Sequence, residues 1–370
     1  MNENYMDKKS LVFLCGAKDF HAMDKYRLTK KYFDGDVILV TDTIEGEEQK
    51  SLIDSGDQVH HLFIVDRLLF KKQSRVGHVW RNIVKLVLIP IQVRKLKAFY
   101  RNNPGYIYHA IPMYYMLLCY IAKIPFVGTP QGSEILVRPK QSKWYKKNAI
   151  KVLKAARYVI VDSQRMKKEI EVMSGVKAVV LKNGFNTSEI LSLPYCAEKK
   201  HKILSIRALR NLYRINEIIE VRNQTLPKTP ITMVYPAWDE KYKRASQALL
   251  KPFDKNLGRL ERKELYEVLR NTLLVVSIPK SDSSPRSVYE AIFAGAIVAA
   301  AYSEYIDELP ESMKERIFIV DLKKNNWLVE AMEYAINKSS EPFEPCNRAL
   351  EICDEKRTIT RVINTIYECR

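Results

Sequence analysis

The segment from Leu273 to Tyr302 constrains the fold more than any other part of this 370-residue chain. Leu273–Ile278 is a continuous apolar run rich in β-branched residues, as expected of a parallel strand that is buried on both faces. A polar loop follows, in which Ser284 and Pro285 predict the cap and the first position of a helix that stops at Gly295. A second apolar run comes next. This order of strand, loop, helix and strand predicts an α/β fold with a parallel sheet.

The polar residues of this segment are concentrated where the predicted helix begins, beyond the carboxyl end of the strand. Ligands of open α/β sheets bind at that edge. The helix start offers backbone N–H groups and the positive end of the helix dipole. Ser283, Ser284, Ser287 and Arg286 add hydroxyl groups and a cation. Together they predict a site for a phosphate or a diphosphate.

Two acidic residues flank this predicted anion site, Asp282 before the helix and Glu290 within it. A carboxylate beside an anion is unfavourable for its charge alone, so these residues are better suited to accept hydrogen bonds from sugar hydroxyls. The alternative interpretation is that Asp282 is a turn residue and Glu290 a solvated helix position.

The spacing of the two acids, followed by Ala and a short run to Gly295, resembles the E-x7-E element of retaining glycosyltransferases of the group 1 or family 4 type. These enzymes have the GT-B fold. The resemblance implies two Rossmann-like α/β domains that face each other across a cleft. It also implies that Asp282 acts in catalysis at the transferred sugar and that Glu290 binds the ribose of the nucleotide. Asp282 stands where the family usually has Glu.

Two further stretches resemble the donor-binding half of the same family. Ile203–Arg207 is a predicted strand, and Arg207 occupies the place of an arginine that grips the diphosphate in relatives. The usual Lys-Gly pair is missing, so the second cation is Arg210 or Arg214, with Arg210 preferred; the alternative is a solvated helix position. Gly258 matches a glycine in the loop that borders the nucleobase.

The N-terminal half begins with a predicted strand, Leu11–Cys15, and a turn that lacks the G-x-G-x-x-G pattern of dinucleotide-binding proteins. Because this turn lies at the carboxyl edge of the predicted sheet, Gly16, Lys18 and His21 are candidate acceptor-binding residues. A lone His in a turn is more often incidental, which is the alternative for His21.

The family resemblance supplies further candidates in this half. Relatives carry a His at the end of the strand that corresponds to Tyr106–Ala110, and a Gly-Ser-Asp-like loop after the next strand. The counterparts are His109, with an expected catalytic role, and the acceptor-binding residues Gly132, Ser133 and Glu134 of a predicted loop.

A polar stretch without periodicity, Leu191–His201, indicates a linker between two domains. We therefore expect an acceptor-binding domain at residues 1–195 and a donor-binding domain at residues 196–345. Residues 346–370 have a helical pattern, and the family resemblance implies that this helix crosses back onto the N-terminal domain.

The six cysteines are scattered and form no CxxC or Cys/His cluster, which predicts a reduced compartment and no structural zinc. No apolar leader and no apolar run of membrane-spanning length is apparent, so we expect a cytoplasmic protein. No Asp-x-Asp metal set stands out either. We expect no metal and no cofactor, with Arg207 and the helix dipole stabilising the departing diphosphate.

The net charge of +18 is concentrated in one region. Between Arg67 and Arg157 there are nineteen Lys and Arg residues and one acid, Glu134. Such a field attracts polyanions or anionic lipid headgroups. The predicted helix Val79–Tyr100 combines apolar residues, Pro90 and cations, which favours a helix lying on an anionic membrane; the alternative is a buried helix with a basic outer face. The cations expected near headgroups are Arg81, Lys85, Arg94, Lys95, Lys97 and Arg101.

The family resemblance implies a retaining glycosyltransferase, and the basic amphipathic face suggests that it acts at the inner face of the cell membrane. It would move a sugar from a nucleotide-sugar to a lipid-linked or oligosaccharide acceptor in bacterial surface polysaccharide synthesis, such as capsule or O-antigen. The alternatives are a nucleotide-sugar epimerase, an inverting transferase, a degenerate relative without activity and a polyanion-binding protein. Nucleic-acid binding is disfavoured, because there is no known binding motif and no predicted sheet on which basic residues are interleaved with stacking aromatics.

Overall fold

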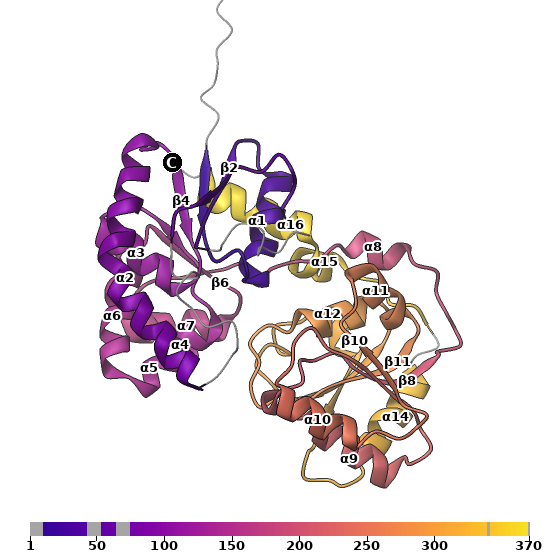
Figure 1. Cartoon of the computed structure of the whole chain (residues 1–370). Helices are drawn as coiled ribbons and strands as arrows, with labels where there is room; N and C mark the ends of the chain where they lie inside the picture. Colours follow the sequence, from indigo (N-terminus) through magenta and orange to yellow (C-terminus); the bar gives the residue numbers. More distant parts are fainter. Residues whose placement is uncertain (1–9, 43–52, 64–74, 339–340, 369–370) are drawn as a thin grey trace, which may run out of the picture. The chain divides into compact units, whose positions relative to one another are not determined.

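The computed structural model of the protein describes residues 10–42, 53–63, 75–338 and 341–368, without the side chains of 75–79, 81 and 82. The chain divides into two compact units (Figure 1). Unit 1 consists of Met1–Asn183 and Thr358–Arg370, and unit 2 of Gly184–Arg357. The first transition lies 12 residues before the expected boundary at residue 195, and the second lies 12 residues after the expected boundary at residue 345.

Unit 1 is built on a parallel seven-stranded sheet with the order β3-β2-β1-β4-β5-β6-β7. The chain therefore runs outward from β1 in one direction and then returns to start again at β4, so the order reverses between β1 and β4. The strands are β1 (Leu11–Leu14), β2 (Val37–Thr41), β3 (Val59–His61), β4 (Ile107–Ala110), β5 (Val127–Gly128), β6 (Tyr158–Val161) and β7 (Val179–Val180).

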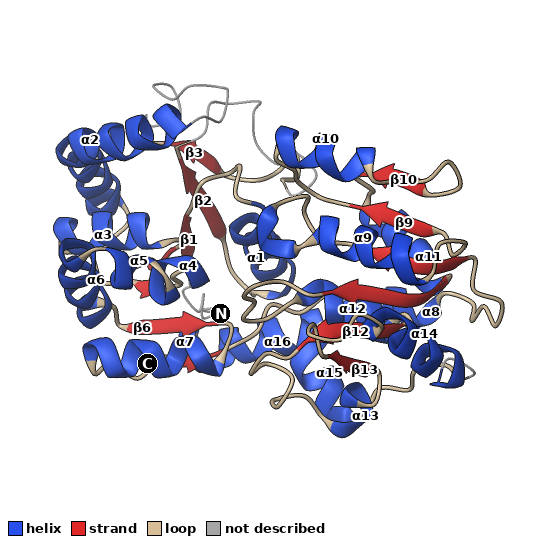
Figure 2. Ribbon diagram, turned by 90° about the horizontal axis from the view of Figure 1, so that it is seen from below, coloured by secondary structure: helices blue, strands red, loops and turns tan. Residues whose placement is uncertain are grey.

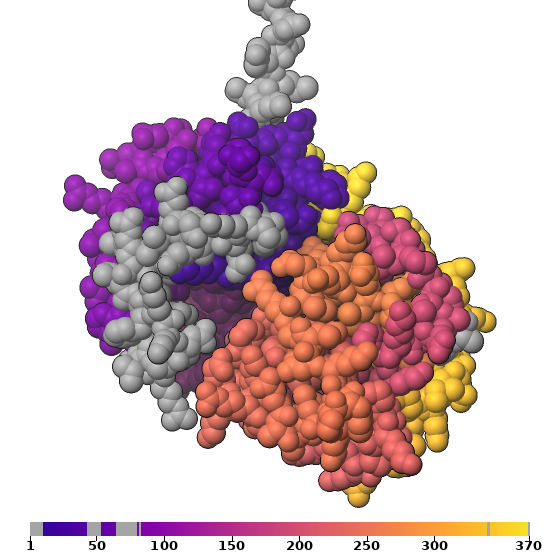
Figure 3. Space-filling view, turned by 45° about the vertical axis from the view of Figure 1, so that its right-hand side comes forward, coloured from indigo at the N-terminus to yellow at the C-terminus, as the bar shows by residue number. Residues whose placement is uncertain are grey.

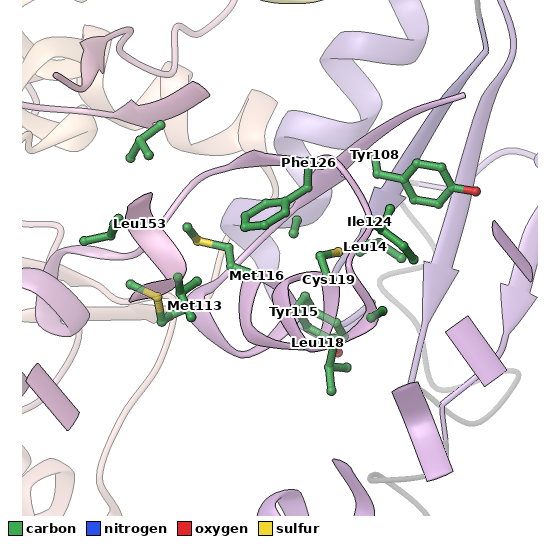
Figure 4. Close-up of a cluster of buried hydrophobic side chains, with 14 of the residues drawn as sticks. Leu14, Tyr108, Met113, Tyr115, Met116, Leu118, Cys119, Ile124, Phe126 and Leu153 are labelled. Atoms are coloured by element: carbon green, nitrogen blue, oxygen red, sulfur yellow. The ribbon is translucent and has the colours of Figure 1, made fainter. Parts of the chain in front are cut away.

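Apolar side chains fill both faces of this sheet, which explains the continuous apolar runs of its strands. Val12 and Leu14 of β1 pack in one core with helices α2, α3 and α6, whereas Leu11 and Phe13 pack in a second core with α1. Figure 2 shows α2, α3 and α6 together on one side of the sheet, and Figure 4 shows part of their core. The helices are α1 (Phe20–Tyr32), α2 (Arg75–Asn102), α3 (Met113–Ala122), α4 (Gly132–Leu136), α5 (Arg138–Gln141), α6 (Lys143–Ala155) and α7 (Gln164–Ser174).

The C-terminal segment completes the second core of unit 1. Helix α16 (Glu355–Val362) and the π-helical turn η4 (Ile363–Tyr367) bury Ile359, Ile363 and Tyr367 beside β1 and α1. The surface view shows yellow C-terminal residues beside indigo N-terminal ones (Figure 3). The final residues therefore form part of the N-terminal unit.

Unit 2 contains a parallel six-stranded sheet with the order β10-β9-β8-β11-β12-β13, which reverses between β8 and β11. Alternate residues of its strands lie in two separate apolar cores, one on each face of the sheet. Helices therefore cover both faces. The strands are β8 (His201–Ser205), β9 (Ile231–Val234), β10 (Lys255–Gly258), β11 (Thr272–Ser277), β12 (Ile297–Ala301) and β13 (Ile317–Val320). The helical elements are α8 (Thr187–Ser192), η3 (Asn211–Tyr213), α9 (Ile215–Thr225), α10 (Glu240–Ala248), α11 (Arg262–Arg270), α12 (Arg286–Phe293), α13 (Glu311–Lys314), α14 (Trp327–Lys338) and α15 (Asn347–Cys353).

Two local predictions were wrong. Helix α12 starts at Arg286 and its cap position is Pro285, not Ser284, because the ψ of 89° at Pro285 lies outside the helical range. Gly132 and Ser133 open the short helix α4 rather than a loop, since Gln131 and Glu134 form a capping box there. Gly295 does end its helix with a left-handed φ of 85°.

Helix α2 continues through Pro90 as one helix. None of the helices that the structure describes is both long enough and apolar enough to span a bilayer.

Candidate functional site: an arginine clamp at the switch point of unit 2

The predicted donor-binding residues of unit 2 meet at the point where its strand order reverses. Arg207 follows β8 and Asp282 follows β11, and these two parallel strands are neighbours. Their carboxyl ends therefore lie at the same edge of the sheet. Ligands of open α/β sheets bind outside the carboxyl ends of strands at such a reversal.

The guanidinium of Arg207 joins the two loops. It donates one hydrogen bond to the Ser287 hydroxyl at 2.8 Å and one to the carboxylate of Asp282. Its guanidinium carbon lies over the Tyr213 ring, 4.5 Å from the ring centroid. The Arg207 side chain is 11% exposed and that of Asp282 15%. The clamp is thus largely desolvated but reachable from water, as a group that holds a charged ligand must be.

Glu290 lies about one helical turn after Arg286 on α12 and is buried. Its Oε1 accepts hydrogen bonds from Arg286 Nε at 3.0 Å and from the Tyr266 hydroxyl at 3.3 Å. Within the described part of the chain, no hydrogen bond to its Oε2 is recorded. Glu290 is therefore held in a fixed orientation by one oxygen only. Burial, and secondly the charge of Glu290, raise the pKa of Tyr266, so this hydroxyl remains a donor.

The start of α12 has no side-chain cap among the described residues. Its first-turn N–H groups can therefore bind an anion, next to the Ser287 hydroxyl and the Arg207 guanidinium. Ser284 precedes the helix and does not cap it. Asp282 Oδ1 accepts a hydrogen bond from the Ser283 backbone N–H at 2.9 Å, which fixes the loop before the helix.

Four residues that support this site were not predicted from the sequence. The Tyr213 ring lies beneath the Arg207 guanidinium, and the Tyr266 hydroxyl donates to Glu290. The Ser303 hydroxyl donates to the Asp282 carbonyl oxygen at 3.1 Å. Tyr305 is buried close to Asp282. Burial, and secondly the charge of Asp282, raise the pKa of the Tyr305 phenol. Ser303 and Tyr305 follow β12, the neighbour of β11. A search for polar residues after every predicted strand would have included them.

The other predicted donor-binding residues lie at the same edge of the sheet. Arg210 is exposed at the start of η3. Arg214 has a left-handed backbone conformation at the start of α9, and its Nε lies 3.7 Å from a carboxylate oxygen of Glu217. Gly258 ends β10 with a φ of 69°, which favours glycine, and its carbonyl accepts from the Tyr235 N–H at 2.9 Å. The contacts of the described residues do not distinguish Arg210 from Arg214 as the second cation.

The predicted acceptor-binding residues of unit 1 gather at the carboxyl edge of its own sheet. Gly16 follows β1, and His21 is exposed in the first turn of α1. Gly132 and Ser133 open α4, and the Gln131 side chain of that helix start donates to Asp19, the cap of α1, at 2.5 Å. The two helix starts are thereby held together.

A buried carboxylate that was not predicted, that of Asp42, lies beside Gly16. A Cβ atom at Gly16 would be 3.6 Å from Asp42 Oδ1 and from the Tyr115 hydroxyl. Asp42 directly follows β2, and it hydrogen-bonds Tyr115. This edge of unit 1 therefore presents a carboxylate and a hydroxyl in addition to the predicted residues.

Glu134 has a structural function in unit 1. Its carboxylate is buried, and Oε2 accepts from the backbone N–H groups of Met113 and Gln131, both at 3.0 Å. Oε1 lies 3.6 Å from Arg138 Nη1. Glu134 thus stabilises the starts of α3 and α4 together. Its predicted contact with an acceptor stays a prediction.

The structure does not support a catalytic role for His109. The residue is 0% exposed, its Nδ1 lies 2.6 Å from the Tyr367 hydroxyl, and its Nε2 lies 2.8 Å from Thr129 Oγ1. Burial, and secondly the charge of Lys25, lower the pKa of His109 well below 6.5, so the ring is neutral. Because both nitrogens have hydrogen-bond partners, His109 connects β4 to the C-terminal segment, and its predicted catalytic role stays a prediction.

Among the described residues there is no group of three or more His, Cys, Asp and Glu side chains arranged to hold a metal ion.

With this geometry established, comparison with known proteins defines the fold. No family profile and no curated protein sequence matches the chain. Solved structures match over nearly its whole length. HepE of Anabaena, determined with UDP and glucose, has a TM-score of 0.70 and 15% identity, covering 98% of this chain and 100% of its own.

Two further structures agree. Sucrose-phosphate synthase from Thermosynechococcus elongatus has a TM-score of 0.74 and 13% identity, covering 97% of this chain and 98% of its own. The lipopolysaccharide outer core galactosyltransferase WaaB, in its apo form, has a TM-score of 0.64 and 12% identity, covering 97% and 99%. Structures described as UDP-N-acetylglucosamine 2-epimerases also match. The protein has the GT-B fold, which confirms the predicted fold class.

A pH test checks the structural assignment of His109. Because the pKa of this ring is depressed in the folded protein, the unfolded chain binds more protons below pH 6.5, and stability falls as the pH falls. We expect a loss of at most about 1.4 kcal/mol per pH unit from this residue below that pH. Native-state hydrogen exchange of β1 and β4 between pH 7.5 and 5 measures it.

The His109→Gln variant should lack this component, and His21→Gln, which changes an exposed His, should retain it. An unchanged pH slope in His109→Gln would show that the ring is not a buried neutral group.

Proposed function

We propose that this protein is a retaining glycosyltransferase that moves a sugar from a nucleotide-sugar donor to a hydroxyl group of a lipid-linked or oligosaccharide acceptor. One observation carries the proposal: Arg207 is held by Asp282 and Ser287 at the uncapped start of α12, at the switch point of a GT-B unit. The site combines a cation, free N–H groups and carboxylates. These are the groups that a sugar joined to a diphosphate requires.

Each residue has a role in this proposal. Arg207 and the first turn of α12 bind the diphosphate and stabilise the negative charge that develops as it leaves. Arg210 or Arg214 supplies a second cation, and Ser284, Ser287 and Arg286 complete the anion site. Asp282 accepts hydrogen bonds from the transferred sugar. Glu290 accepts one from the ribose through Oε2, and Gly258 borders the nucleobase.

The acceptor is proposed to bind at the carboxyl edge of unit 1. Gly16, His21, Gly132, Ser133 and Glu134 belong to this region, and Asp42 with Tyr115 adds groups suited to sugar hydroxyls. Synthesis of a bacterial surface polysaccharide is the proposed setting, at the cytoplasmic face of the cell membrane. No cofactor or metal is required in this proposal, because the nucleotide-sugar is a substrate and protein cations neutralise its diphosphate.

Epimerase activity is the second candidate, because structures described as UDP-N-acetylglucosamine 2-epimerases share the fold. The products separate the candidates. A retaining transferase gives a glycoside with the anomeric configuration of the donor, whereas an inverting transferase gives the opposite one. An epimerase changes the donor sugar without any acceptor. Proton NMR of the reaction with a membrane extract as the acceptor source distinguishes the three, and a donor epimerised without acceptor would contradict our proposal.

Substitution of Arg207 tests the diphosphate site. We expect Arg207→Ala to raise the dissociation constant of the nucleoside diphosphate about 10- to 100-fold, because hydrogen bonds between charged groups are lost. Binding of the corresponding nucleoside should change little. Thermal-shift screening of UDP, GDP, ADP and CDP selects the nucleotide, and isothermal titration calorimetry measures both constants.

Two further variants are the controls. Arg207→Ala with Asp282→Asn removes the carboxylate that the single variant leaves unpaired, and it should still bind the diphosphate weakly. Arg244→Ala changes an exposed arginine of α10 and should bind normally. An equal loss in Arg244→Ala, or no loss in Arg207→Ala, would count against the assigned diphosphate site.

Glu290 gives a separate test of ribose recognition. If Oε2 accepts a ribose hydroxyl, the wild-type protein should bind the ribonucleotide about tenfold more tightly than its 2′-deoxy or 3′-deoxy analogue. Glu290→Gln should reduce that preference to about threefold or less, since an amide oxygen is a weaker acceptor than a carboxylate. Glu267→Gln, at an exposed position of α11, should retain the full preference. Calorimetric titrations with the paired nucleotides measure the ratio, and an unchanged ratio in Glu290→Gln would reject the role.

A further inference from the structure

Helix α2 has apolar residues on two faces, and only one of these faces is covered. Leu96 is buried in the core of unit 1, and Val84 and Leu88 form a small buried cluster with Tyr114 of α3. On the other side Ile83, Leu86, Val87 and Ile91 are 47%, 49%, 68% and 48% exposed. Spacings of three and four residues place these four side chains along one stripe of the helix. The protein therefore presents a continuous apolar ridge to its surroundings.

The same stripe becomes cationic towards the end of the helix. Arg94, Lys97 and Arg101 continue the spacing, and all three are exposed. By contrast, Lys95 donates to the Leu62 carbonyl oxygen and Lys85 lies over the Tyr114 ring, so both are directed back to the protein. The exposed face of α2 thus consists of an apolar part followed by a positively charged part.

Helix α6 adds charge to the same layer. Helices α2, α3 and α6 share one core, and both ribbon views show them side by side (Figures 1 and 2). Trp144 of α6 is 62% exposed. The lysines of α6 are exposed, and none forms an ion pair with a carboxylate of the described residues: Lys143, Lys146, Lys147, Lys151 and Lys154. Glu134, the one acid between Arg67 and Arg157, is buried and does not offset them.

We infer that the outer face of the α2–α3–α6 layer docks on an anionic lipid bilayer. Ile83, Leu86, Val87 and Ile91 enter the boundary between headgroups and acyl chains, while the α6 lysines and Arg94 contact lipid phosphates. The proposed function places the protein at a membrane; this inference names the surface, and it holds or fails independently of sugar transfer.

Charge and composition together favour this partner over two others. A second copy would bring the α6 lysines against equal charges, which opposes self-association through this face. A nucleic acid would satisfy the lysines but would leave the ridge of α2 without an apolar partner. A bilayer with anionic lipids satisfies both, because its surface is negative and its interior is apolar.

Flotation with phosphatidylcholine vesicles, with and without phosphatidylglycerol, tests the inference on the full chain. We expect binding only to vesicles that contain the anionic lipid. Replacing the ridge by Ile83→Ser, Leu86→Ser, Val87→Ser and Ile91→Ser should weaken it at least about tenfold, as should Lys146→Gln, Lys147→Gln, Lys151→Gln and Lys154→Gln. Nucleoside diphosphate affinity, measured separately, should not change in either variant.

Matched control variants change the same number of exposed residues elsewhere. The apolar control is Val172→Ser, Ile319→Ser, Leu322→Ser and Ile336→Ser, and the charge control is Lys228→Gln, Lys241→Gln, Lys251→Gln and Lys263→Gln. Both should bind vesicles like the wild type. The inference is overturned if the controls lose binding equally, if the ridge variant binds normally, or if sedimentation shows that the ridge forms a dimer.

Discussion

The hydrogen bonds from Arg207 to Asp282 and Ser287 are the contacts on which the proposed site depends. Asp282 is 75 positions from Arg207 in sequence, and the two meet only because β8 and β11 are neighbours in the sheet. Desolvation strengthens such a charged contact, and the Tyr213 ring limits the positions of the guanidinium. A ligand that binds there meets an arginine that is already oriented. Less conformational entropy is then lost on binding, which favours recognition of a diphosphate.

Most of the fold was predictable because the strands are short apolar runs between polar turns. Leu273–Ile278, for example, corresponds to β11 within one residue at each end. The location of the donor site was predictable for a related reason, since polar residues after a parallel strand have one edge of the sheet available to them. Tyr213, Tyr266 and Tyr305 were missed because nothing local separates a tyrosine that orients a charged group from one that fills a core.

The surroundings of His109 and Glu134 could not be predicted from their local sequences. His109 hydrogen-bonds Tyr367, which is 258 positions away, so its burial depends on where the C-terminal segment packs. Glu134 looked functional because it is the one acid of a basic region. Its carboxylate instead accepts backbone N–H groups from two helix starts, a role that exists only once α3 and α4 lie together. In both cases a polar residue near a candidate site forms hydrogen bonds that stabilise the fold.

The sequence pattern of helix α2 does not show which of its sides is exposed. An ordinary surface helix has one apolar stripe, and the stripe identifies its buried side. In α2 apolar residues lie on both sides, so the periodicity is weak and does not indicate which side is covered. Burial separates the two sides: Val84 and Leu88 are enclosed, while Leu86 and Val87 remain exposed. Exposed apolar groups gain nothing in water, whereas partial burial at a lipid interface is favourable at about 25 cal/mol per Å². The lysines of α6 add an attraction that depends on anionic lipid. The apolar contribution comes from α2 and most of the charge from α6, so each can be reduced without disturbing the core that joins the two helices.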